Sequence, residues 1–104
     1  MDDEVHLQIS APVETDEEAA FLVVVRTLQG TVRPGARLHA VRDLTGKDRP
    51  ADLTVRRIWL FQRETDLLSP GSTAKLHITG DPGGAALLEN CLLIGRSNSS
   101  PTQT

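Results

Sequence analysis

Residues 30–38 read Gly-Thr-Val-Arg-Pro-Gly-Ala-Arg-Leu and place a Pro-Gly pair directly before a run of alternating apolar and polar side chains. Residues 67–76 (LLSPGSTAKL) repeat this arrangement. Proline fixes the first central angle of a β-turn, and glycine adopts the positive φ that can follow it. Two such turns in a chain of 104 residues predict a compact all-β barrel.

The rest of the chain predicts about six short strands and no helix, because no segment has a helical period. The first strand, 5–9, alternates strictly, and the alternation can continue through Ala11 and Val13. Residues 21–25 form a continuous apolar run, which is typical of a strand covered on both faces. The other predicted strands are 38–41, 53–60, 74–78 and 91–94; residues 16–18 are predicted as an acidic turn, 44–50 as a polar loop and 80–84 as a turn.

Within the fourth strand the alternation breaks at Arg56-Arg57. One extra residue there would form a β-bulge and restore the pattern. On that register Ile58 and Leu60 face the core, while Trp59 and Phe61 point away from it. The opposite register exchanges the two pairs, and the sequence leaves this choice open.

Composition indicates a soluble intracellular protein. The hydrophobic fraction is 38%, only 3% of residues are aromatic, and the one cysteine cannot form an internal disulfide. No apolar run is long enough to cross a membrane, and the acidic start is unlike a signal peptide. We therefore expect a cytoplasmic protein, with one barrel domain over residues 1–96 and a disordered tail over 97–104.

The net charge of −3 is unevenly distributed. Residues 1–20 hold seven acids and no bases, and the remainder holds seven acids and eleven bases. Nine of those bases lie within residues 26–63, where only three acids accompany them. Such an excess could form a basic face for nucleic acid, or simply the solvated outer positions of a barrel.

No group of residues predicts catalysis. The phosphate-binding loop of nucleotide hydrolases is absent, and the three histidines are isolated and outward-facing in phase. Cys91 heads an apolar strand without a neighbouring base, so it is expected to be a small buried hydrophobe. We therefore expect no enzymatic activity, no metal site and no cofactor.

The landmarks together resemble the second domain of translational GTPases such as elongation factor Tu. They are the two Pro-Gly segments, the strand at 55–60, Thr79-Gly80, and residues 89–93 (ENCLL). The resemblance covers roughly residues 5–95 and implies a six-stranded, closed Greek-key β-barrel. It also implies a connection to RNA, the ribosome or a GTPase partner.

Three departures limit what can be transferred from this family. Asn90 replaces a glycine before the last strand, which asparagine tolerates because it readily adopts left-handed conformations. Trp59 and Gln62 stand where elongation factor Tu has a glutamate and an arginine near the tRNA acceptor end, so those two roles are not expected here. The 104 residues hold no GTPase motif, so we expect a stand-alone domain that itself binds no nucleotide.

The first functional hypothesis is a non-catalytic interaction module that binds an unknown protein partner through Trp59 and Phe61. The alternative is an RNA- or ribosome-binding protein that uses a basic face around Arg56 and Arg57. A further possibility is that the acidic N-terminal run folds over this face. The candidate residues for both binding hypotheses are Arg33, Arg37, Arg42, Arg56, Arg57, Trp59, Phe61 and Arg63.

Overall fold

The computed structural model describes residues 4–15, 20–84 and 87–96. The predicted tail at 97–104 and the predicted acidic turn at 16–18 lie outside these ranges, as do Asp2 and Asp3 of the acidic N-terminal run. The described residues contain strands and no helix, so they include no helix long and apolar enough to cross a membrane.

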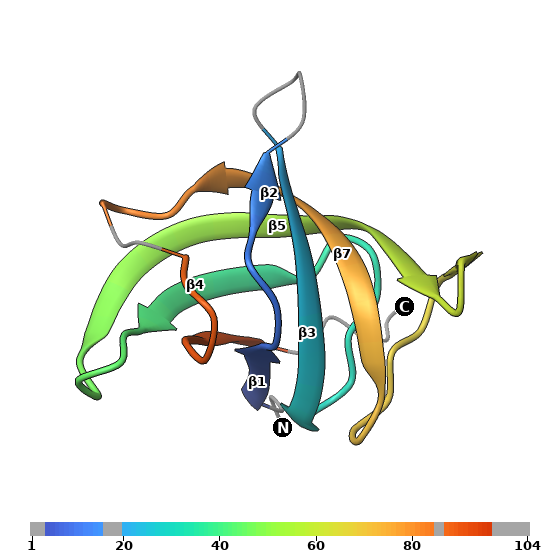
Figure 1. Ribbon diagram of the computed structural model, residues 1–104, viewed down its shortest axis with the longest axis horizontal. Helices are drawn as coiled ribbons and strands as arrows, with labels where there is room; N and C mark the ends of the chain where they lie inside the picture. Colours follow the sequence, from blue (N-terminus) through green and yellow to red (C-terminus); the bar gives the residue numbers. More distant parts are fainter. Residues whose placement is uncertain (1–3, 16–19, 85–86, 97–104) are drawn as a thin grey trace, which may run out of the picture.

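Six longer strands form a closed antiparallel barrel (Figure 1). Neighbouring strands follow the order β1-β8-β4-β5-β7-β3, and pairing between β1 and β3 closes the ring. Two short strands lie outside this ring, with β2 paired to β3 and β6 paired to β5. The bounds are β1 Glu4–Ile9, β2 Glu14–Thr15, β3 Phe21–Gln29, β4 Arg37–Arg42, β5 Asp48–Leu60, β6 Arg63–Thr65, β7 Thr73–Asp81 and β8 Leu92–Arg96.

The connections follow a Greek key. Strands β4, β5 and β7 are consecutive neighbours, and β8 then returns to lie beside β4. A spatial order of fourth, first, second and third strand defines that motif. The predicted six-stranded, closed Greek-key barrel is therefore confirmed.

Aliphatic side chains fill the interior, because alternate residues of every long strand point inward. Val5, Leu7 and Ile9 are completely buried on β1, and Val23 and Val25 are completely buried on β3. The other strands contribute in the same way, with Leu38, Val41, Leu53, Val55, Ile58, Leu76, Ile78 and Leu93 in the same cluster. No aromatic ring is among the buried residues that form this cluster.

Both Pro-Gly turns are present where the sequence predicts them. Gly35 has a φ of 99° and Gly71 a φ of 89°. The Ala36 amide donates to the Arg33 carbonyl at 3.0 Å, which closes the first turn. The segments that lead into the two turns also pair with each other, since Val32 and Leu68 exchange backbone hydrogen bonds of 2.8 and 2.9 Å.

The bulge in β5 is also confirmed, and it settles the register of the strand. Val55 lies opposite Ile78 and Arg57 lies opposite His77, so Arg56 is the extra residue. Ile58 is completely buried, and Leu60 packs against the core from a half-buried position. Trp59 therefore points to the outside of the barrel.

Two predicted connections are partly strand. Residues 48–50 of the predicted loop belong to β5, because the connection is a tight turn over residues 43–47 only. The Asp43 amide donates to the Lys47 carbonyl at 2.8 Å and closes this turn. Pro50 is accepted in β5 because it lies opposite Ala40, where the pairing of β4 with β5 shifts register. Gly80 and Asp81, predicted as turn, continue β7 opposite Leu53 and Asp52.

Other strand ends differ from prediction by a few residues. β1 ends at Ile9 instead of continuing through Ala11 and Val13, and β8 begins at Leu92 instead of Cys91. The short strand β6 was not predicted. Its three residues carry no alternating apolar pattern, so only the hairpin with β5 defines it.

Gly80 permits the close approach of β7 to β5, which provides a test of the fold. A Cβ added at Gly80 would lie 2.1 Å from the Asp52 carbonyl oxygen, and the φ of +123° disfavours any side chain. We predict that Gly80→Ala lowers the free energy of unfolding by about 2–4 kcal/mol, measured by chemical denaturation.

Gly46→Ala is the matched control, because Gly46 also has a positive φ, +88°, but open space around its Cβ. It should cost only the backbone strain, about 1 kcal/mol. Equal losses for the two variants would contradict the close approach at Gly80.

The β4–β5 turn provides a pH-dependent test. The Thr45 hydroxyl, the Lys47 and Thr45 amides and Arg49 donate to the Asp43 carboxylate and lower its pKa from 3.8 to about 2. Because the folded pKa lies below the unfolded one, the ionised carboxylate stabilises the fold fully above pH 3.8, and this stabilisation is lost as pH falls through about 2.

We predict that a carboxyl-detected NMR titration gives Asp43 a midpoint near 2, and that Thr45→Val shifts it upward. A midpoint at the ordinary 3.8 in the unmodified protein would contradict the turn geometry.

Candidate binding groove

The hairpin between β5 and β6 presents an exposed aromatic side chain on an unusual backbone. Leu60 lies opposite Arg63, so Phe61 and Gln62 are its two loop residues, with φ of 53° and 67°. A two-residue loop with both φ values positive is the type I′ turn, which normally uses Asn-Gly or Gly-Gly. A bulky residue there is strained, yet Phe61 occupies the position with 91% of its surface exposed.

Trp59 stands beside this turn on the outer face of the barrel. Its ring makes an edge-to-face contact with His77 of β7, with ring centroids 6.4 Å apart and an interplanar angle of 71°. This contact orients the indole, which is half-buried.

The two aromatic residues form one side of a groove of about 480 Å³ on the outside of the barrel. The first residues of β7 form its floor, and outward-facing residues of β3 form the opposite side. Because the residues are mostly apolar, the groove suits an apolar occupant. It is lined by Leu22, Val24, Trp59, Phe61, Gln62, Thr73, Ala74 and Lys75.

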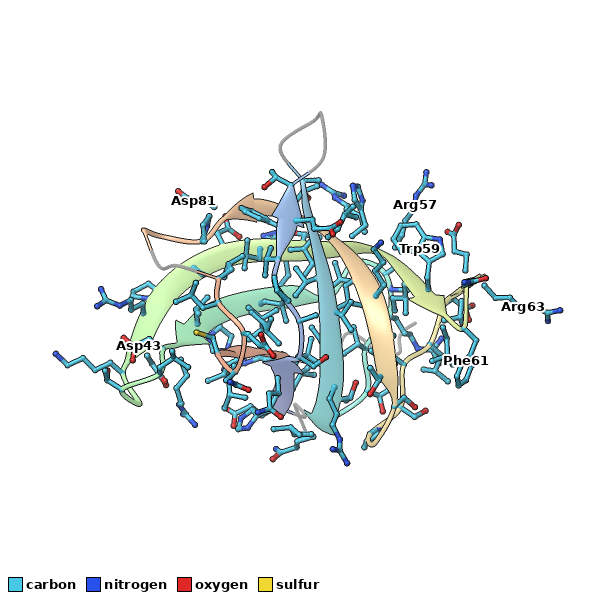
Figure 2. All side chains as sticks on the ribbon, viewed as in Figure 1. Asp43, Arg57, Trp59, Phe61, Arg63 and Asp81 are labelled. Atoms are coloured by element: carbon cyan, nitrogen blue, oxygen red, sulfur yellow. The ribbon has the colours of Figure 1, made fainter. Side chains whose placement is uncertain are left out.

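Four of the eight candidate residues come together at this end of the molecule. Arg57, Trp59, Phe61 and Arg63 project from the end of β5 and its hairpin, opposite the end that carries Asp43 (Figure 2). Both arginines are exposed. Of the arginines predicted beside the two aromatic residues, Arg57 shares the outer face of β5 with Trp59, two residues away. Arg63 lies opposite Leu60 and therefore belongs to the other face of the hairpin.

The other four candidates, like Arg57 and Arg63, are not among the residues that line the groove. Arg56 occupies the bulge and donates to the Thr79 hydroxyl at 2.9 Å. Arg33 lies in the first Pro-Gly turn, and Arg37 begins β4. Arg42, at the other end of β4, forms an ion pair of 2.7 Å with Asp48, and the hydrogen bond to Asp48 raises the pKa of Arg42.

Sequence reasoning missed the side of the groove that is opposite the aromatic residues. Leu22 and Val24 are the outward residues of the 21–25 run, and both are half-buried. The run correctly indicated an apolar outer face. Its position across β7 from Trp59 depends on β7 pairing with both β3 and β5. The alternation of residues 74–78 already placed Lys75 on the outer face of its strand. Only the pairing of β7 with both neighbours places it in the groove.

The remaining reactive side chains do not converge. Cys91 is buried with 1% of its surface exposed, as predicted. His6 contacts Glu4 at 2.7 Å, and His77 contacts Trp59. Within residues 4–15, 20–84 and 87–96, no three His, Cys, Asp or Glu side chains lie close enough to hold a metal ion.

The fold is that of the β-barrel domain of translational GTPases, as the sequence resemblance implied. No protein-family model and no curated protein matches the chain by sequence. Among solved structures it is similar to GDP-bound aIF5B from Aeropyrum pernix, with a TM-score of 0.63 and 21% identity over 89% of this chain. It is also similar to apo translation elongation factor SelB from Methanococcus maripaludis, with a TM-score of 0.57 and 18% identity over 96% of this chain.

These similarities concern a small part of each larger protein. This chain matches 15% of the aIF5B chain and 20% of the SelB chain, in the β-barrel portion and outside the catalytic GTPase domain. At such identities the likeness establishes the fold alone, so function has to be argued from the groove.

The strained turn predicts a gain in stability on substitution. Replacing Phe61-Gln62 by Asn-Gly supplies the residues that a type I′ turn prefers, and the exposed Phe61 ring loses little packing. We predict that the free energy of unfolding rises by about 1–2 kcal/mol in chemical denaturation. A loss of stability would show that Phe61 serves the fold of the hairpin.

Proposed function

We propose that this barrel is a non-catalytic binding module and that its groove holds an apolar segment of a protein partner. The observation that carries the proposal is Phe61, fully presented to solvent on a strained turn beside Trp59. Backbone strain and exposed aromatic surface both cost stability in the isolated domain. Contact with a partner would offset both costs, since buried aromatic anchors dominate binding energy at protein interfaces.

The chemistry of the groove supports binding more than catalysis. Among the residues that the structure describes, its lining contains one charged side chain, Lys75, and no carboxylate, imidazole or thiol. A nucleophile needs an adjacent base to become reactive, and Thr73 has no such neighbour in the lining. An apolar surface with a single cation can hold a ligand without transforming it.

RNA binding is the second candidate, because two exposed arginines, Arg57 and Arg63, lie at the same end of the barrel as the two aromatic residues (Figure 2). Stacking on aromatic rings together with phosphate contacts is a common mode of single-strand recognition. Two observations favour protein binding. The far side of the groove, formed by Leu22 and Val24, is aliphatic, and Glu64 of β6 is the residue that pairs with Trp59 across the hairpin. That carboxylate would repel a phosphate backbone.

Loss of the exposed ring should weaken partner binding strongly without harming the fold. We predict that Phe61→Ser weakens binding of a partner isolated on the unmodified protein by about 30-fold or more, measured by calorimetry after RNase treatment. Leu44→Ser is the matched control, since Leu44 is also exposed, at 61%, but lies in the turn between β4 and β5. Equal affinities of the two variants would contradict the proposal, and a partner lost with RNase would favour the RNA alternative.

A further inference from the structure

The charge at the centre of the groove defines the chemistry of its occupant. Lys75 lies opposite Trp59 on one side and opposite Val24 on the other. Its hydrocarbon stem therefore runs between the aromatic and the aliphatic side of the groove. The ammonium group of such a lysine stays in contact with water at the end of the stem.

Two further cations lie on the strands that neighbour Lys75. Arg57 precedes Trp59 by two residues on β5, and Arg26 of β3 lies opposite Thr73 in the groove floor. Within the part of the chain that the structure describes, four cations of this region form no ion pair: Arg26, Arg57, Arg63 and Lys75.

At the far end of the barrel, in contrast, two arginines form ion pairs. There Arg42 and Arg49 are paired with Asp48 and Asp43, at 2.7 and 3.3 Å. Unlike these two arginines, the cations around the groove form no ion pair with a described residue, so they can pair with an anionic ligand.

Carboxylates lie at the two outer margins of the same surface. Glu64 on β6 lies opposite Trp59, and Glu14 on β2 lies opposite Leu22. Across the sheet the charge therefore runs from negative through positive to negative. A polyanion extended across the strands would meet both margins, whereas a ligand with one central carboxylate meets only the cations.

We propose that the groove recognises a short protein segment in which apolar side chains flank a single carboxylate, with that carboxylate paired to Lys75. The inference rests on the proposed function and specifies the chemistry of the partner. Neighbouring strands are about 4.8 Å apart, so the distance from Trp59 across β7 to Val24 is roughly 10 Å, and a five-residue extended segment, about 13 Å long, covers it. In an extended segment alternate side chains share one face, so the pattern is apolar-x-acidic-x-apolar.

The test uses three peptides, acetylated and amidated, of sequence Leu-Gly-Glu-Gly-Leu, Leu-Gly-Gln-Gly-Leu and Leu-Gly-Lys-Gly-Leu. Trp59 is the single tryptophan of the chain and lines the groove, so its fluorescence reports occupancy directly. We expect the glutamate peptide to bind about fivefold more tightly than the glutamine peptide, and the lysine peptide to bind weakest.

Reversing the charge of the groove should reverse this order. Lys75→Glu should prefer the lysine peptide, while Lys47→Glu should leave the order unchanged, because Lys47 precedes β5 at the far end of the barrel. Both lysines are exposed, so both variants should fold, and circular dichroism checks this.

The outcomes separate this inference from the proposed function. Equal binding of all three peptides that is lost in Phe61→Ser would overturn the charge preference and keep the groove as the binding site. Absence of any peptide response would overturn both. Tight binding of an oligouridine that is lost in Lys75→Glu would overturn the choice of a protein segment.

Discussion

The β-bulge formed by the extra residue Arg56 in β5 is the constraint on which the groove depends. Because side chains alternate along a strand, one inserted residue changes the face of everything after it. The amide and carbonyl of Val55, just before the bulge, bond to Ala36 and Gly35 at 2.9 and 2.7 Å. The first Pro-Gly turn is thus attached to β5 directly before the bulge, and the strand beyond it carries Trp59 outward.

The same region joins the two Pro-Gly segments to each other. The Val32–Leu68 bridge connects the segment before the first turn to the segment before the second, and Gly71 donates to the Thr27 carbonyl at 2.8 Å. These bonds fix where β7 begins, and the first residues of β7 are the floor of the groove. The turns are scaffold, and they position the groove, whose lining contains neither of them.

The sequence predicted those parts of the molecule that local chemistry determines. The turn at Pro34-Gly35 and the bulge at Arg56 follow from residue types and alternation. The left-handed Asn90, with a φ of 77°, was expected from the resemblance to a family that has a glycine at this position. The groove could be predicted only on its Trp59 side, because Leu22 and Lys75 join it through strand pairings between residues far apart in sequence. The turn at Phe61-Gln62 could not be predicted, since its residues contradict the usual preferences of that turn.

The central claim is that the surface around Phe61 contacts a protein segment. Its most direct test places a photoreactive benzoylphenylalanine at position 61 and, separately, at position 44, followed by irradiation in native lysate and mass spectrometry of the linked peptides. The account predicts one recurrent peptide at position 61, with apolar residues flanking a carboxylate, and none at position 44. Crosslinks to the same proteins from both positions, or to RNA alone from position 61, would contradict it.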